Sequence, residues 1–207
     1  DILDISDIRS GDVKFSVQPN GSDVKISISK TQSIILIDQL KYPPSGGRMQ
    51  FATVKFSDAM MREQDILRRA VTDQGTPGDD HILGTAYADT IYPGTGTNLI
   101  QPGKGSDLIH HQGGIDTIRR DPEDLLGTDV LVLDDFARSE ITFAAGAEQD
   151  LVLTTPDGSM IVIEEQLSIP AGEKGTNIEI FRLRGEELSD DIMRKLFFPK
   201  GPVTSGD

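Results

Sequence analysis

GTPGDDHIL GTAYADTIY PGTGTNLIQ PGKGSDLIH HQGGIDTIR runs from Gly75 to Arg119 as five consecutive copies of nine residues. An isoleucine stands at the eighth position of every copy: Ile82, Ile91, Ile100, Ile109 and Ile118. A short polar residue stands two positions earlier: Asp80, Asp89, Asn98, Asp107 and Asp116. Because a random chain rarely holds two registers through five copies, the stretch predicts a repetitive architecture.

Each copy predicts a turn followed by a short strand. Glycines in the turn permit positive φ and let backbone carbonyls approach one another, which a Cβ would obstruct. The last three residues form the strand, with the isoleucine pointing inward. Each copy is half a coil, so a turn lies beside the turn from two copies later. The pattern therefore predicts a parallel β-roll.

The turns suit calcium, a hard cation that takes about six to eight oxygen ligands. Ions are expected between alternate copies, which pairs Asp80 with Asn98, Asp89 with Asp107, and Asn98 with Asp116. The candidate metal ligands are Gly75, Gly78, Asp80, Gly84, Asp89, Gly94, Gly96, Asn98, Gly103, Gly105, Asp107, Gly113, Gly114 and Asp116. We expect two or three ions.

Three positions depart from the pattern. Asn98 supplies a neutral oxygen, which weakens both ions that it touches. Tyr87 stands where the other copies carry glycine, and a tyrosine at positive φ is costly, so distortion is expected in the turn ending at Asp89. Leu125, two copies after Asp107, has a side chain that cannot ligate, so the array is expected to end there. A degenerate roll that no longer needs metal is the alternative.

Composition narrows the class of protein. The chain has 207 residues, a formal net charge of −14 and no cysteine. Acidic excess argues against nucleic acid and anionic membranes, which favour basic patches. Zero cysteines exclude disulfides and thiolate metal sites. No cleavable amino-terminal signal or membrane-spanning apolar run occurs. The pattern is already under way at Asp1, so we expect a segment of a longer protein.

The residues on either side of the repeats resemble each other. The stretch 5–58 aligns with 132–185 at an offset of about 127 residues, and 65–69 matches 191–195 after a one-residue slip. Alternating apolar residues predict antiparallel strands in each copy, and helical spacing predicts a short helix at the end of each. An open roll leaves unpaired edges, so such flanks can cover both of its ends.

The predicted fold class is all-β, with a parallel β-roll of calcium-binding nonapeptides between two related antiparallel β-sandwich-like caps, each ending in a short helix. The expected units are the first flank (residues 1–72), the roll (75–119), the second flank (127–198) and a tail (199–207).

The nonapeptides resemble the hemolysin-type calcium-binding repeats of RTX proteins, and the flanks resemble sequences that follow repeat blocks in large RTX toxins. The resemblance implies export from a Gram-negative bacterium by a type I secretion apparatus, with an uncleaved carboxy-terminal signal. It implies that the chain crosses unfolded and folds in extracellular calcium. It also implies the ligating turns Gly75–Asp80, Gly84–Asp89, Pro93–Asn98, Pro102–Asp107 and His111–Asp116.

Other chemistry has less support in the sequence. His110 and His111 are neighbours, which usually point apart on a strand, and a structural zinc site normally has about four nitrogen or sulfur ligands. No nucleophile elbow, H-E-x-x-H helix or phosphate-binding loop occurs, so we expect no enzyme. The sequence favours a calcium-folded module that supports secretion and folding of a larger toxin or adhesin. A module that binds a host receptor or a polysaccharide is the alternative.

Overall fold

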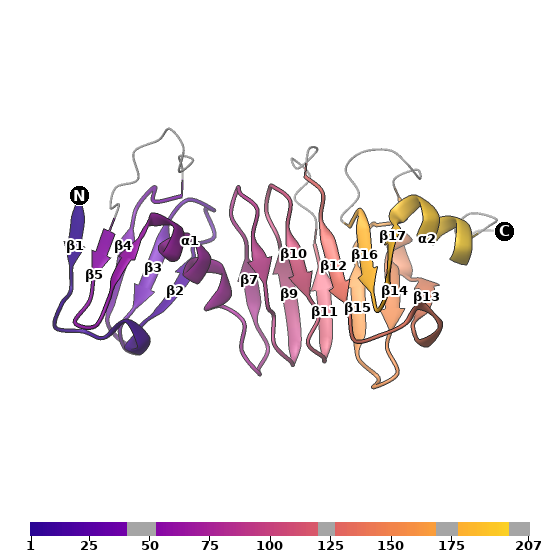
Figure 1. Cartoon of the computed structure of the whole chain (residues 1–207), viewed down its shortest axis with the longest axis horizontal. Helices are drawn as coiled ribbons and strands as arrows, with labels where there is room; N and C mark the ends of the chain where they lie inside the picture. The colour runs from indigo at the N-terminus through magenta and orange to yellow at the C-terminus, as the bar shows by residue number, and fades with distance from the viewer. Residues whose placement is uncertain (41–52, 120–126, 169–177, 199–207) are drawn as a thin grey trace.

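The computed structural model of the chain describes residues 1–40, 53–119, 127–168 and 178–198. Figure 1 shows an elongated molecule in which the first flank, the repeats and the second flank follow one another along the long axis. Among the described residues, no helix is both long and apolar enough to cross a bilayer. The predicted tail and Leu125 lie outside the described residues.

The repeat block forms short parallel strands, as its periodicity predicts. They are β7 (His81–Leu83), β8 (Thr90–Ile91), β9 (Thr97–Gln101), β10 (Leu108–His110) and β11 (Ile115–Ile118). Strands β7, β9 and β11 pair in parallel in one sheet, and β8 pairs in parallel with β10 in another. Alternate copies therefore build opposite sheets, which confirms the predicted β-roll.

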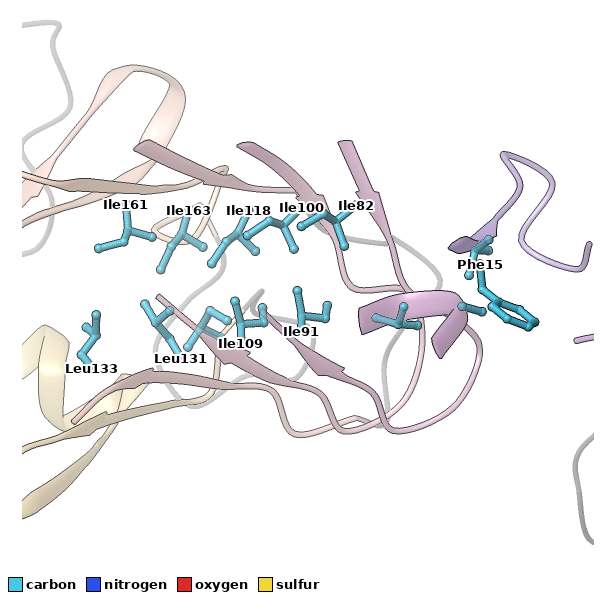
Figure 2. Close-up of a cluster of buried hydrophobic side chains, with 14 of the residues drawn as sticks. Phe15, Ile82, Ile91, Ile100, Ile109, Ile118, Leu131, Leu133, Ile161 and Ile163 are labelled. Atoms are coloured by element: carbon cyan, nitrogen blue, oxygen red, sulfur yellow. The ribbon is translucent and has the colours of Figure 1, made fainter. Parts of the chain in front are cut away.

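The repeat isoleucines form the core of the roll. All five have 0% of their surface exposed. Figure 2 shows two facing rows, with Ile82, Ile100 and Ile118 opposite Ile91 and Ile109. Burying one such side chain stabilises a fold by about 1.5–3 kcal/mol. The rows thus supply a continuous apolar centre, while the turns at either edge are left for polar residues.

The second flank continues both sheets of the roll. Its elements are β12 (Val130–Leu133), a 3-10 turn (Arg138–Glu140), β13 (Thr142–Ala145), a 3-10 turn (Ala147–Gln149), β14 (Leu151–Thr154), β15 (Met160–Ile163), β16 (Ile180–Leu183), β17 (Glu186–Ser189) and α2 (Asp190–Phe197). Strand β12 pairs in parallel with β10 and β16, and β15 pairs in parallel with β11. No break in the sheets separates the repeats from this flank.

This continuity differs from the predicted antiparallel cap. Antiparallel pairs lie farther out, between β13 and β14, β14 and β15, and β16 and β17. The physical reason is that the last coil has strand edges in both sheets, and parallel pairing with β12 and β15 satisfies their backbone groups. Leu131, which pairs with Ile109, and Ile163, which pairs with Ile118, then extend the two rows of isoleucines (Figure 2). The division into separate domains stays a prediction.

The first flank has the same order of strands and closing helix, with one 3-10 turn among its described residues where the second flank has two. Its elements are β1 (Ile2–Asp4), a 3-10 turn (Ser10–Asp12), β2 (Lys14–Val17), β3 (Val24–Ser27), β4 (Ser33–Leu36), β5 (Thr53–Lys55), β6 (Met60–Arg62) and α1 (Glu63–Thr72). Strand β1 is parallel to β5, which is antiparallel to β6, and β2, β3 and β4 form an antiparallel sheet. A short helix therefore closes both flanks, as predicted.

The first flank covers the start of the roll with side chains and a helix. Helix α1 lies against β8. Gln74 donates through Nε2 to the Leu83 carbonyl at 2.7 Å, and its Oε1 accepts the Leu83 amide at 3.0 Å. The Tyr87 hydroxyl donates to the Leu40 carbonyl at 3.3 Å. Thus each flank covers one end of the roll, but by different contacts.

The offset of 127 residues continues into the helices. Arg62 and Ser189 are the N-cap residues of α1 and α2, and the buried Ile66 of α1 corresponds to the buried Met193 of α2. The predicted one-residue slip in this segment is therefore wrong. Burial of the same helical position, which similarity of sequence letters alone does not reveal, fixes the alignment.

Candidate calcium-binding turns

The repeat turns line two edges of the roll. We call the turns ending at Asp80, Asn98 and Asp116 the mixed edge, and those ending at Asp89 and Asp107 the acidic edge. Each turn lies beside the turn from two copies later, because the strands of one sheet come from alternate copies. This is the arrangement that the spacing predicts.

Glycine is needed where neighbouring coils touch. A Cβ on Gly94 would lie 1.9 Å from the carbonyl oxygen of Thr76, and one on Gly103 would lie 2.0 Å from that of Thr85. Positive φ occurs at the glycines of the later coils: Gly94, Gly96, Gly103, Gly105, Gly113 and Gly114. The glycines therefore hold backbone carbonyls together along each edge, as predicted. Gly78 differs, since neither a positive φ nor a close contact requires glycine there.

Tyr87 fits its turn without positive φ, contrary to the expected distortion. Neither Tyr87 nor Gly78, its counterpart on the other edge, adopts positive φ. Both belong to the first coil, and it is Gly105 of the next coil that takes positive φ and packs on the Tyr87 backbone. Burial, with the Glu63 carboxylate as a second cause, raises the pKa of the Tyr87 hydroxyl.

Hydrogen bonds join the polar residues of neighbouring coils. The Asp80 amide donates to Asn98 Oδ1 at 3.1 Å, and the Asp89 amide donates to Asp107 Oδ1 at 2.8 Å. Each bond brings together two side chains that are predicted to share an ion. The predicted pairing of alternate copies is thus present in the geometry of both edges.

The acidic edge continues beyond the repeats. The Asp107 amide donates to Asp129 Oδ1 at 2.9 Å, and the Asp129 amide donates to Glu179 Oε2 at 2.7 Å. The row of carboxylates therefore does not end at the register position of Leu125, because the extra residues before β12 move the next position to Asp129. The sequence contains the same pattern here, since Asp129 precedes Leu131 by two residues, as each polar residue of the repeats precedes its isoleucine. It was not recognised because the nine-residue period is broken before it.

Two threonines that the sequence analysis missed close the first turn of each edge. Thr76 donates through its amide and hydroxyl to Asp80 Oδ2, at 2.7 and 2.8 Å. Thr85 does the same to Asp89 Oδ2, at 2.6 and 3.0 Å. The signal was a threonine in the second place of both copies. These bonds fix one oxygen of each carboxylate inside its turn and leave the other for a ligand.

The acidic edge holds buried negative charge. Burial raises the pKa of Asp89 from 3.8 to about 6, although the Thr85 hydrogen bonds oppose the shift. Asp107, in the next coil, is fully buried. A carboxylate whose charged form is disfavoured by burial is stabilised by a nearby cation. The edge thus combines carboxylates and close-packed carbonyl oxygens, the ligands that a hard divalent cation prefers.

On the mixed edge, polar side chains form hydrogen bonds with one another. Asn98 Nδ2 donates to Asp116 Oδ1 at 2.9 Å, and His111 Nδ1 lies 2.6 Å from Asp116 Oδ2. The His111 side chain is 1% exposed. Both oxygens of Asp116 therefore already have polar partners. The predicted pair of Asn98 and Asp116 is brought together, but it is a poorer ligand pair than Asp89 and Asp107.

The adjacent histidines do not form a transition-metal pair. The His110 ring stacks on Tyr92 with centroids 4.5 Å apart, whereas His111 contacts Asp116. Burial lowers the pKa of His110. Within the described ranges, no three acidic or histidine side chains gather as a metal cluster. An ion at the turns therefore takes most of its ligands from backbone carbonyls, which suits calcium rather than zinc.

Comparison with known families agrees with this geometry. The model of the RTX calcium-binding nonapeptide repeat, in four copies, matches residues 74–109 and 83–118. No curated protein matches the chain. The chain thus contains RTX calcium-binding nonapeptide repeats. Repeats of this kind bind Ca²⁺ and are typical of proteins exported by type I secretion.

Proposed function

We propose that the chain is a calcium-dependent folding module of a larger secreted protein, a toxin or an adhesin, exported through a type I secretion apparatus. The observation that carries this proposal is the acidic edge, where the half-buried Asp89 and the fully buried Asp107 lie in adjacent coils. The matched repeat family supports it. The module has no catalytic role in this proposal.

Calcium acts here as a structural ligand. Extracellular calcium modules bind with dissociation constants of about 10⁻⁴ to 10⁻³ M, so their sites stay empty inside a cell. The net charge of −14 then opposes compaction of the chain. Outside, each filled site adds about 1–2 kcal/mol of folding stability at several-fold saturation. Two or three coupled ions are enough to decide whether a marginal roll folds.

Calcium removal tests the folding proposal directly. Circular dichroism and amide hydrogen exchange, recorded in calcium and in excess chelator, should show the repeat strands protected only in calcium. A magnesium arm separates calcium binding from general charge screening. An unchanged exchange pattern at the repeat isoleucines after chelation would remove the proposed switch.

Export needs a separate test, because calcium-dependent folding does not report on secretion. The tail (199–207) lies outside the described residues, so the structure does not bear on its role. We propose that the carboxy-terminal segment carries the secretion signal. Residues 127–207 fused behind a passenger protein should direct its export through a type I apparatus. The same fusion ending at residue 189 lacks α2 and the tail, and it should stay inside. Equal export of the two fusions would place the signal elsewhere.

A groove favours a second candidate function, recognition of a receptor or polysaccharide. It has a volume of about 880 Å³ and lies between α1 and the acidic edge, with Arg68, Tyr87 and Tyr92 in its lining. Tyr92 is 43% exposed. Binding of the calcium-loaded chain to a glycan array, lost in Tyr92→Ala, would support this candidate. Absence of binding would leave the folding role alone.

A further inference from the structure

The ring of Tyr92 stands on the outward face of the roll as an oriented aromatic surface. It stacks on the His110 ring of the neighbouring strand β10, with centroids 4.5 Å apart and planes 18° apart. Burial is the first cause that lowers the pKa of His110, so the imidazole in this stack is uncharged at neutral pH. The imidazole covers one face of the Tyr92 ring. The opposite face lies on the side of β8 where helix α1 packs, and Tyr92 is 43% exposed.

This opposite face forms a wall of the groove between α1 and the acidic edge. The groove has a volume of about 880 Å³, and small-molecule pockets have volumes of about 300–1,000 Å³. Helix α1 lies beside the first strands of the roll (Figure 1). It contributes the apolar side chains of Leu67 and Val71 and the exposed polar side chains of Gln64 and Arg68. An aromatic and apolar lining with a few polar side chains is typical of sites that bind a small ligand.

The charged side chains that line the groove have partners within the chain. The Arg69 guanidinium lies 2.6 Å from Asp73 Oδ2, and Arg68 lies 3.5 Å from Asp65 Oδ1. The carboxylate of Asp89 is predicted to bind calcium. The groove thus offers an aromatic face and hydrogen-bonding groups with little net charge. A neutral ligand suits this lining better than an anion, which the net charge of −14 repels.

We propose that the groove binds a neutral oligosaccharide, with one sugar ring stacked on Tyr92. A pyranose ring has an apolar face of carbon–hydrogen groups and a rim of hydroxyl groups, so it matches both parts of the lining. Gln64 and Arg68 of α1 and Thr90 of β8 line the groove and are exposed, which places them to form hydrogen bonds with the rim. An aromatic side chain of a peptide would match the ring of Tyr92 but not these polar groups.

The proposal rests on the calcium-dependent folding described under Proposed function, and it names a ligand class for the second candidate given there. On the side of the roll, the groove is lined by Thr85, Tyr87 and Asp89 of the first turn of the acidic edge. Calcium shared by Asp89 and Asp107 fixes this turn. Sugar binding therefore requires calcium, so the module binds its ligand only outside the cell.

Tyrosine fluorescence gives a local signal for the test. The chain has three tyrosines and no tryptophan, and Tyr87 and Tyr92 both line the groove. The full chain in calcium is titrated with neutral oligosaccharides of glucose, galactose, mannose and N-acetylglucosamine. An oligomer of a uronic acid is the anionic comparison. At least one neutral oligosaccharide should change the fluorescence saturably in calcium and leave it unchanged in excess chelator.

Variants locate the binding site, and calorimetry measures them because it does not depend on the tyrosine signal. Tyr92→Ala removes the stacking surface and should weaken binding at least about ten-fold. Tyr92→Phe keeps the ring and should bind within about two-fold of the original chain. Gln64→Arg fills the groove from the helix and should also weaken binding at least about ten-fold.

The matched control is Ile192→Ala, which removes a side chain of similar exposure, 46%, from α2 at the opposite end of the molecule (Figure 1). It should leave sugar binding unchanged. Circular dichroism in calcium checks that each variant folds. If Tyr92→Ala does not fold, Gln64→Arg decides the location, since it changes an exposed residue of α1 and none of the predicted calcium ligands.

The outcomes are distinct. Calcium-dependent binding of a neutral oligosaccharide, lost in Tyr92→Ala and Gln64→Arg but kept in Tyr92→Phe and Ile192→Ala, supports the proposal. A chain that folds in calcium but binds none of the neutral oligosaccharides overturns it and leaves the folding role intact. Tighter binding of the uronic acid oligomer, or binding that neither groove variant weakens, also overturns it. Equal sugar binding in calcium and chelator overturns calcium control of the site, whereas a fold unchanged by chelator contradicts the calcium-folding function itself.

Discussion

The two edges of the roll arise from one repeat yet present different chemistry. On the acidic edge, carboxylate follows carboxylate from Asp89 through Asp107 to Asp129. On the mixed edge, Asn98 interrupts the series and donates to Asp116. A neutral amide between two carboxylates supplies hydrogen bonds where the acidic edge needs positive charge. The comparison teaches that one roll combines an edge that depends on cations with an edge that is partly satisfied by its own side chains.

The largest effect is expected at the centre of the acidic edge. Asp107→Asn removes one charge from a fully buried position that we predict to be a ligand, and it should raise the calcium midpoint of folding about ten-fold, because affinity follows ligand charge. A calcium titration followed by circular dichroism measures this. Asp80→Asn on the mixed edge should shift the midpoint less. The control Asp7→Asn makes the same charge change at an exposed position of the first flank. Equal midpoints for Asp107→Asn and this control would remove Asp107 from the ligands.

Acid should weaken the acidic edge more than the mixed edge. The pKa of Asp89 is raised from 3.8 to about 6 in the metal-free fold. Protonation of this group therefore favours the metal-free fold below about pH 4, and that contribution is lost as the pH rises through about 6. Calcium needs the ionised form, so affinity at this site should fall about ten-fold by pH 5, with proton release on binding near pH 6.

Calcium titrations at pH 5, 6 and 7.5, with calorimetry in two buffers, measure both quantities. In Asp89→Asn, the change in calcium affinity between pH 5 and 6 should disappear. A change that persists in Asp89→Asn would assign the titration to another group.

Asn98→Asp should make the mixed edge resemble the acidic edge. The change replaces the donor to Asp116 by a second carboxylate, so the metal-free form loses a hydrogen bond and gains repulsion. Bound calcium offsets both effects. The calcium midpoint of folding should therefore fall a few-fold, which corresponds to about 1 kcal/mol of binding free energy. Calorimetry reports affinity, and hydrogen exchange in chelator reports the destabilised metal-free form. A higher midpoint would mean that the amide is itself the better partner at this position.

The smallest effect is expected from His111. His111→Ala releases Oδ2 of Asp116 for metal and should lower the calcium midpoint by about two-fold or less. His81→Ala makes the same change at an exposed position of β7 and is the matched control. A large rise in the midpoint of His111→Ala alone would instead show that the imidazole holds the turn in place.

Much of the roll follows from local sequence. The isoleucines repeat on a fixed period, and a period of nine fixes which turns become neighbours, so the pairs Asp80–Asn98 and Asp89–Asp107 are readable from spacing. Glycine positions are predicted for the same reason, since close backbone approach is a local steric demand. Tyr87 shows the limit, because only the stacking of coils reveals that the first coil needs no positive φ.

The rest depends on pairing over long separations. Asp129 and Glu179 join the acidic edge only because β12 and β16 follow β10 in one sheet, across stretches that obey no repeat. Alternating apolar residues predict strands but do not distinguish an antiparallel cap from strands that extend a parallel roll. The similarity between the two flanks can be seen in the sequence. Only the strand order of the structure reveals that the second flank extends both sheets of the roll whereas the first does not.

The paired bonds between Gln74 and Leu83 bear on how the molecule behaves at high concentration. Strand β7 is the outer strand of its sheet, and an open strand of this kind is a template on which other chains can assemble. The amide group of Gln74 imitates a peptide unit, so it engages both the amide and the carbonyl of Leu83 without offering a further strand. We expect this pairing by one uncharged side chain to oppose the addition of further strands at this end.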